Sequence, residues 1–252
     1  MIIWLASYPR SGNTFFRIVA HQLYGIPTYS GFRSGGNGAC RHITGHKRLP
    51  EALYRALLEG DKTTYMKYHD SEDFFLIKAH STLDELRASE LPSIVLVRDA
   101  RDALISFTWY WMEYGHVWRK DRLKLAFETS MKFFGFKQTL FHRILNQHLN
   151  NRYWINFYEG WRHKQEGNTH FLRFEDLTTD PVESVHNALK GVGVELNLYN
   201  AEIPTFDELQ KLSPGFFRQG KAGAWEKEFP SNLYDQFWET HGPTMRALGY
   251  NH

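Results

Sequence analysis

The residue types that bind anions or move protons gather in four short stretches. The first is "YPRSGNTF", which places between an apolar run and a helix-like segment the residues Arg10, Ser11, Gly12, Asn13 and Thr14. A turn from strand to helix leaves backbone N–H groups unpaired at the positive end of the helix dipole, which suits an anion. Arg10 adds a full charge, and Gly12 lets the chain approach closely. The alternative interpretation is an ordinary helix start, with Ser11 or Asn13 as the N-cap.

Two more stretches follow apolar runs. In "IKAH", alternation along a strand puts Lys78 and His80 on one face, where an imidazole could take a proton and an ammonium could stabilise an anionic oxygen. In "VRDARDALIS", Arg98 ends a strand and Ser106 lies on the next helix, so a planar fork and a hydroxyl could meet a phosphate. Core packing explains Lys78 and His80 as well as catalysis does. Taken separately, Arg98 and Ser106 are better explained as a solvated arginine and a helix serine bonded to its own backbone.

The fourth stretch is "GFFRQGKAGAWEKEF", Gly215 to Phe229, which combines three glycines, Arg218, Lys221 and aromatic rings without regular periodicity. Such a loop could fold over a nucleotide, or it could be an ordinary exposed loop. The first stretch lacks the Walker A pattern G-x-x-x-x-G-K-[ST], which disfavours an ATPase or an ordinary kinase.

The elements that position these stretches alternate between strand and helix. Apolar runs predict strands over Ile2–Tyr8, Phe74–His80, Ser93–Asp99 and Thr169–Leu177. Helical spacing predicts helices over Asn13–Tyr24, Val182–Lys190, Thr205–Leu212 and Asn232–Leu248, with long helical stretches between residues 101 and 167. We therefore expect an α/β fold, a three-layer α/β/α arrangement with a central parallel sheet and the polar residues at the carboxyl ends of its strands.

The segment from Thr28 to Asp70 interrupts this alternation. "GFRSGGNGAC" reads as a loop and "LPEALYRALLEG" as a short amphipathic helix. We expect one domain over residues 1–252, with residues 28–70 inserted over a site for the second substrate and residues 214–229 closing on a ligand.

Composition narrows the function classes. A formal net charge of +2 over 252 residues gives no broad attraction to nucleic acid or membranes, so a basic site must be local. The single cysteine, Cys40, excludes an intramolecular disulfide, and no apolar run reaches membrane-spanning length. These features predict a soluble, cytoplasmic protein without a membrane span and without a nucleic-acid partner. No convincing metal-ligand cluster appears, so no metal is expected.

Taken together and in order, the four stretches resemble the PAPS-dependent sulfotransferase family (PAPS, 3′-phosphoadenosine 5′-phosphosulfate). "YPRSGNTF" is similar to the family's P-loop-like 5′-phosphosulfate loop, and "RDARDALIS" to its 3′-phosphate segment. "IKAH" matches the K-x-H that carries the catalytic base, "FFRQGKAGAW" the loop R-K-G-x-x-G-x-W, and "RFEDLTTDP" the Y-E-D-x-x-x-D-P turn. The resemblance spans nearly the whole chain.

The resemblance implies a role for each matched position. The 5′-phosphosulfate would be held by Arg10, Ser11, Gly12, Asn13 and Thr14. The 3′-phosphate would be held by Arg98, Ser106, Arg218, Gln219 and Gly220. The adenine would stack on Phe15, with weaker candidates in Phe174, Phe206, Phe216 and Phe217. Catalysis would rest on His80 as the base, with Lys78 and Arg10 stabilising charge.

Three positions depart from the family pattern. Arg10 replaces the common lysine of the first loop, and Gln219 replaces a lysine of the closing loop. After Trp225, the sequence "EKEFPSNLYD" does not reproduce the family's dimer motif, which leaves the oligomeric state open.

The expected activity is transfer of the sulfuryl group from PAPS to an acceptor hydroxyl, releasing PAP (3′-phosphoadenosine 5′-phosphate). Phenols, lipid alcohols, sugars and natural products such as cyclic peptides all suit an aromatic pocket, and the run "SFTWYWMEYGHVW", Ser106 to Trp118, is a candidate lining. Two alternatives remain: a nucleotide or sugar kinase on a related phosphate-binding fold, and a noncatalytic PAP-binding protein.

Overall fold

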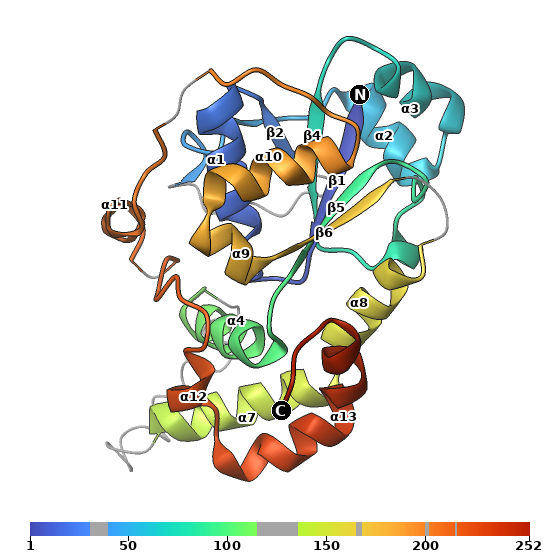
Figure 1. Ribbon diagram of the computed structural model, residues 1–252. Helices are drawn as coiled ribbons and strands as arrows, with labels where there is room; N and C mark the ends of the chain where they lie inside the picture. The colour runs from blue at the N-terminus through green and yellow to red at the C-terminus, as the bar shows by residue number, and fades with distance from the viewer. Residues whose placement is uncertain (31–39, 115–135, 165–167, 200–201, 215) are drawn as a thin grey trace, which may run out of the picture. The chain divides into compact units, whose positions relative to one another are not determined.

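The computed structural model describes residues 1–30, 40–114, 136–164, 168–199, 202–214 and 216–252 (Figure 1). The chain divides into two compact units. The first unit comprises Met1–Arg98 and Asn156–Gly220, and the second comprises Asp99–Ile155 and Lys221–His252. The expected single domain over residues 1–252 stays a prediction.

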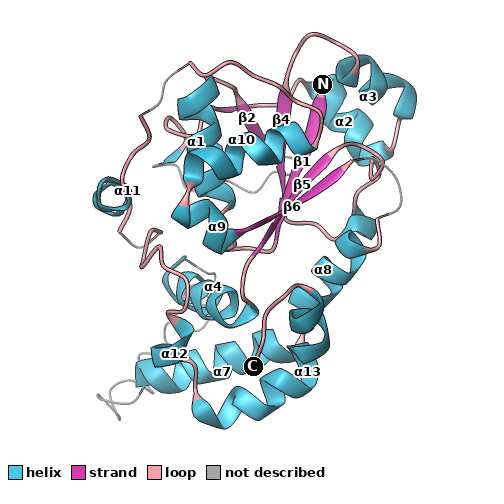
Figure 2. Ribbon diagram, viewed as in Figure 1, coloured by secondary structure: helices cyan, strands magenta, loops and turns pink. Residues whose placement is uncertain are grey.

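A parallel sheet forms the centre of the first unit. Within the described residues it has six strands in the order β3-β2-β4-β1-β5-β6, and every neighbouring pair is parallel (Figure 2). The strands are β1 Ile2–Ser7, β2 Thr28–Ser30, β3 His46–Lys47, β4 Phe75–Ala79, β5 Ser93–Val97 and β6 Thr169–Arg173. All six residues of β1 are buried, so both faces of the central strand are covered, as the continuous apolar runs predict.

Helices cover this sheet. The helices of this unit are α1 Asn13–Tyr24, α2 Glu51–Glu59, α3 Lys62–His69, α8 Tyr153–Arg162, α9 Phe174–Thr179, α10 Pro181–Gly191 and α11 Phe206–Leu212, with the short 3₁₀ helix η2 Leu83–Glu85. Among them α11 lies away from the sheet (Figure 1). Alternate side chains of the strands, such as Ile3, Leu5 and Leu76, pack against Val19 of α1 and Val185 of α10 in one apolar core. Figure 1 shows α1 and α10 side by side against the sheet. The three-layer α/β/α prediction is confirmed.

The second unit is helical in its described part. It contains α4 Ala100–Tyr114, α7 Phe136–Asn150, the short α12 Trp225–Glu228, the 3₁₀ helix η3 Ser231–Leu233 and α13 Tyr234–Ala247. Arg101 lies at its centre: it forms a buried ion pair with Asp99 at 2.7 Å and stacks 3.7 Å over the ring of Trp225. It also donates to the carbonyl of Asn251 at 3.2 Å, which ties down the end of the chain.

Several details differ from the sequence predictions. The strand expected over Thr169–Leu177 ends at Arg173, and Phe174 begins helix α9. Between β4 and β5 the chain forms the 3₁₀ turn η2. The segment of residues 28–70 contributes the two strands at one side of the sheet, β2 and β3, and the helices α2 and α3, and its proposed role over the acceptor stays a prediction. Residues 31–39 of that segment, residues 115–118 of the aromatic run and residue 215 of the closing loop lie outside the described residues.

Candidate functional site

The turn between β1 and α1 has the backbone of an anion cradle. Arg10 and Gly12 both adopt positive φ, at 69° and 96°, which bends the chain sharply before the helix begins at Asn13. Gly12 is the N-cap residue, and no side chain caps this helix end. The first N–H groups of α1 therefore point out of the turn at the positive end of the helix dipole. This helix start therefore lacks the side-chain N-cap of the alternative interpretation, and anion binding stays a prediction.

Gly12 is required here for two reasons. Its φ of 96° is one that residues with a Cβ rarely adopt, and a Cβ at this position would lie 2.8 Å from Cδ2 of Phe174. The aromatic ring from the β6–α9 junction thus packs directly against the turn. The close approach of these two segments depends on the missing side chain.

The polar side chains of the turn divide by direction. Asn13 points back into the sheet, where its Nδ2 donates to the carbonyl of Leu5 at 3.0 Å and to Oγ of Ser7 at 3.2 Å. Ser11 is fully buried, with its Oγ 3.3 Å from the hydroxyl of Tyr158. These two side chains fix the loop, whereas Thr14 is half-buried. Contacts with an anion at this turn would come chiefly from the backbone N–H groups.

Lys78 and His80 lie at the end of β4, beside this turn. Lys78 pairs in register with Leu5 of β1 and with Ser30 of β2. Burial, and then the charges of Arg17 and Arg10, lower the pKa of Lys78 to about 8. The strand ends at Ala79, so His80 follows it rather than continuing its alternation. The charge of Lys78 nevertheless acts on His80, as expected of neighbours.

The hydrogen bond of His80 fixes its tautomer. Its Nδ1 lies 2.8 Å from the carbonyl of Ser7, and a carbonyl only accepts, so Nδ1 carries the proton. The lone pair is then on Nε2. Burial, followed by the charge of Lys78, lowers the pKa of His80 to about 3, although the bond to Ser7 opposes this shift. The imidazole is therefore neutral at physiological pH and able to accept a proton at Nε2.

Arg17 is a residue that the sequence predictions missed. It lies on α1, is 5% exposed, and its guanidinium contacts Thr28 of β2 and His46 of β3. Among the described residues no carboxylate pairs with Arg17 or Lys78. A single arginine on a helix carries no sequence signal that separates it from a solvated one, because its partners lie 11 and 29 residues away.

Arg98 reaches from the end of β5 to the same turn. Its Nη1 donates to the carbonyl of Arg10 at 2.8 Å, and its guanidinium lies 4.0 Å above the ring of Phe174. Two residues predicted for the two ends of one nucleotide, Arg10 and Arg98, are thus adjacent in space. Phe174 connects them, since it also packs on Gly12.

The end of the first unit brings the closing segment to Arg10. The guanidinium of Arg10 donates to the carbonyl of Phe216 and lies 4.4 Å above its ring. Phe206 packs on Gly220, where a Cβ would meet the ring at 2.0 Å. The carbonyl of Arg218 accepts from Nε2 of Gln210 at 3.0 Å.

The remaining candidates of this segment differ in exposure. Phe217 is buried in a small cluster with Ile18, Cys40 and Leu209, and Phe15 packs against that cluster. Gln219 is half-buried. Phe217 is therefore held by packing, and Phe15 leaves only part of its ring exposed for contact with a ligand.

Ser106 belongs to the second unit, where it is buried on α4. One turn earlier on that helix, Asp102 accepts from the backbone N–H groups of Gly223 and Trp225, each at 2.8 Å. Asp102 therefore holds the later part of the closing segment. These contacts join residues more than 120 positions apart in the chain, and the sequence pattern does not indicate them.

The aromatic run of α4 packs within the second unit where it is described. Phe107 stacks on His148 at 4.7 Å, and Trp109 stacks on Phe141 at 4.8 Å and donates to Glu228 at 2.9 Å. Core packing thus accounts for these rings. Trp111 remains 36% exposed.

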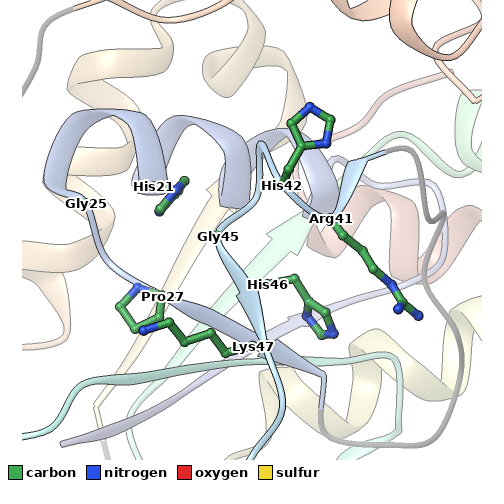
Figure 3. A pocket seen from close by; sticks show the side chains of 8 residues that line it. All are labelled: His21, Gly25, Pro27, Arg41, His42, Gly45, His46 and Lys47. Atoms are coloured by element: carbon green, nitrogen blue, oxygen red, sulfur yellow. The ribbon is translucent and has the colours of Figure 1, made fainter.

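A pocket of about 290 Å³ lies between the C-terminal end of α1 and the β3 segment (Figure 3). It is lined by His21, Gly25, Pro27, Arg41, His42, Gly45, His46 and Lys47. Figure 3 shows the side chains of His46 and Lys47 leaving the strand in opposite directions, Lys47 toward Pro27 and His46 toward Arg41. His46 lines the pocket and also lies 3.1 Å from Nη2 of Arg17.

The described residues show neither a metal-binding cluster nor a membrane-spanning helix. They contain no group of three or more His, Cys, Asp or Glu side chains arranged to hold a metal ion. No helix in this part of the chain is both long and apolar enough to cross a bilayer.

Comparison with known proteins places this geometry in context. The Sulfotransferase domain family matches residues 2–249. Sulfotransferase 4A1 of Homo sapiens is 22% identical over 246 residues, covering 93% of this chain and 77% of that protein. Sulfotransferase 1 family member D1 of Rattus norvegicus is 19% identical over 268 residues, covering 96% and 83%.

Solved structures share the fold. Mouse sulfotransferase SULT7A1 complexed with PAP superposes with a TM-score of 0.63 and 16% identity, covering 97% of this chain and 84% of that one. Retinol dehydratase in a complex with retinol and PAP gives a TM-score of 0.53 and 15% identity, covering 96% and 80%.

Proposed function

Because this chain belongs to the Sulfotransferase domain family, we infer that it is a PAPS-dependent sulfotransferase, and we propose that Lys78 and His80 carry the transfer to an acceptor hydroxyl. The kinase alternative is not favoured, since the family match covers residues 2–249.

The observation that carries the proposed site is a group of cations at one end of the sheet. Arg10, Arg17 and Lys78 are close enough that the charges of Arg10 and Arg17 lower the pKa of Lys78, after burial. Cations that repel one another gain from an anion placed among them. The uncapped start of α1 supplies N–H groups at the same place.

These residues fit the phosphosulfate end of PAPS. The N–H groups after Gly12, together with Arg10 and Lys78, would hold the anionic oxygens, while Ser11 and Asn13 keep the loop in shape. The turn has no room for a Cβ at Gly12, as expected of a backbone cradle. PAPS supplies the sulfuryl group and, after transfer, PAP as the leaving group.

The 3′-phosphate end is assigned from the family resemblance. Arg98, Ser106, Arg218, Gln219 and Gly220 would hold it, and the contact between Arg98 and the carbonyl of Arg10 supports Arg98 in this role. The adenine would lie against Phe15, Phe174, Phe206, Phe216 or Phe217. Among these, Phe174 and Phe217 are buried, whereas the other three rings are partly exposed.

His80 acts as the general base in the proposed reaction. Its Nε2 takes the proton of the acceptor hydroxyl while the acceptor oxygen bonds to sulfur and the bond from sulfur to the 5′-phosphate oxygen breaks. The electron pair of that bond leaves with PAP, where Lys78 and Arg10 stabilise the charge that develops. The products are a sulfate ester, PAP and a proton on His80.

The acceptor is a small molecule with a hydroxyl group. Phenols, lipid alcohols, sugars and natural products remain the candidate classes, because the acceptor-side segments include residues outside the described part of the chain.

The test is transfer from sulfur-labelled PAPS to a panel of these acceptors, with mass spectrometry detecting the gain of one SO₃. His80→Ala should lower kcat on the order of a hundredfold or more while PAP affinity is retained. His163→Ala is the matched control, because His163 is an exposed histidine. Tight PAP binding without transfer to any acceptor would instead favour the noncatalytic PAP-binding protein, and tighter binding of ATP with magnesium would favour the kinase.

A further inference from the structure

Arg17 is a buried cation whose hydrogen-bond partners are neutral. It is 5% exposed, its Nε donates to Oγ1 of Thr28 at 2.9 Å, and its Nη2 donates to Nδ1 of His46 at 3.1 Å. In the described part of the chain it has no carboxylate partner. Burying a charge without a counter-ion destabilises the folded chain, so a residue kept in that state is expected to serve a function.

The contact with His46 shows which group holds the charge. An arginine N–H only donates, so Nδ1 of His46 carries a lone pair and its proton is on Nε2. Burial, and then the charges of Arg17, Arg41 and Lys78, lower the pKa of His46. His46 is therefore neutral, and the positive charge stays on Arg17.

The fold places this charge beside the proposed catalytic residues. Thr28, which Arg17 contacts, lies on β2 two residues before Ser30, and Ser30 pairs in register with Lys78. Arg17 itself is on the helix that begins at the anion cradle. Its charge acts on both Lys78 and His80.

We propose that Arg17 is a positioning residue of the transfer site: it ties strands β2 and β3 to the cradle helix and holds a buried positive charge beside Lys78 and His80. This role rests on the proposed sulfotransferase function. The charge strengthens the attraction for the phosphosulfate, and it adds to burial and to the charge of Lys78 in lowering the pKa of His80.

Repulsion between positive charges sets the direction in which Arg17 shifts the pKa values of the groups near it. Among the described residues, the groups that interact with Lys78 are Arg10 from the cradle loop, Arg17 from α1, His46 from β3 and His80 beyond β4. Cys40 faces Arg10 and Arg17, and burial raises the pKa of its thiol. Removing the charge of Arg17 makes protonation of its neighbours easier, so the pKa values of Lys78 and His80 both rise. Both limbs of a kcat/KM profile should then move to higher pH, whereas mere loss of packing lowers the plateau without moving the limbs.

The direct experiment follows Lys78 by NMR in the protein without nucleotide. Lysine is labelled with ¹³C at Cε, and Lys78→Arg assigns the resonance. In the wild type the midpoint should lie near 8, and Arg17→Gln, which keeps amide donors, should raise it by on the order of one pH unit. Arg17→Lys keeps the charge and Thr28→Val keeps the guanidinium, so both should leave the midpoint in place.

Three results would overturn the role. The first is an unchanged midpoint in Arg17→Gln, and the second is an equal rise in Thr28→Val, which would show that structure and not charge is responsible. Arg17→Met serves if Arg17→Gln does not fold. If neither folds, a wild-type midpoint near the ordinary 10.5 refutes the proposal, since no buried charge would then act on Lys78.

Calorimetry with PAP separates this inference from the function it rests on. Arg17→Gln should bind PAP about tenfold more weakly at low salt, with the difference shrinking as salt rises, and Arg17→Lys should bind like the wild type. A wild type that binds no PAP would refute the proposed function, while the Lys78 titration would still report whether the charge of Arg17 acts there.

Discussion

Replacing Gly12 with alanine tests the cradle at its tightest point. The new Cβ would be held at a φ of 96°, which costs an L-residue about 1–2 kcal/mol. It would also lie 2.8 Å from Cδ2 of Phe174, and forcing an extra methyl into a packed site costs typically about 1–3 kcal/mol. The free energy of unfolding should therefore fall by about 3 kcal/mol. For a chain of this size the melting temperature should fall by about 6–12 °C.

Gly25 provides a matched control on the same helix. It also has positive φ, at 65°, but a Cβ there would meet nothing within 4 Å. Gly25→Ala should therefore lose only the backbone contribution, about 1 kcal/mol. The difference between the two variants isolates the contact with Phe174.

The assay pairs chemical denaturation with calorimetric titration of PAP. Gly12→Ala should bind PAP at least about tenfold more weakly, because Phe174 or the turn must move and the N–H groups then lose their alignment. Gly25→Ala should bind PAP like the wild type. If Gly12→Ala binds PAP normally, or if both glycine variants lose the same stability, the cradle geometry argued here is wrong.

Three further predictions concern other parts of the site and the second unit. Asp102→Ala removes the acceptor of the Gly223 and Trp225 N–H groups, so the free energy of unfolding, measured by urea denaturation, should fall by about 2–4 kcal/mol. Asp102→Asn should lose less, and equal stability of Asp102→Ala and wild type would contradict this prediction. Burial lowers the pKa of His148 to about 4. As the pH falls from 6.5 toward 4, the unfolded chain binds a proton at this histidine while the folded chain does not, so the free energy of unfolding should fall by about 3 kcal/mol for this group. His148→Phe should flatten that dependence in denaturation series at several pH values, and an unchanged slope would refute the assignment. Arg98→Lys keeps the charge but loses the planar fork, so PAP affinity measured by calorimetry should fall about tenfold or more, and unaltered affinity would exclude Arg98 from the site.

The strands could be predicted from the sequence where burial on both faces requires a continuous run of apolar residues. Strands such as Ile2–Ser7 and Ser93–Val97 are buried on both faces and read as continuous apolar runs. The strands Thr28–Ser30 and His46–Lys47, which lie next to each other at one side of the sheet, are short, and pairing within the sheet holds them in place. Composition alone gives no sign of such strands.

The sequence predicts the residue types of the candidate site but not the directions in which their side chains point. The sequence points to Ser11 and Asn13 as donors to an anion, yet their side chains face the core and the sheet. Whether a polar side chain at a helix start faces out or in depends on what lies behind it, which only the packed sheet defines. Arg17 was missed for the related reason that its partners come from distant strands.

The most direct measurement is the electron density of crystals of this protein grown with PAP. The 5′-phosphate should lie within hydrogen-bond distance of the backbone N–H groups that follow Gly12 and within reach of Arg10 and Lys78. A nucleotide bound elsewhere, for instance in the pocket beside His46, with no phosphate at the start of α1, would contradict the account.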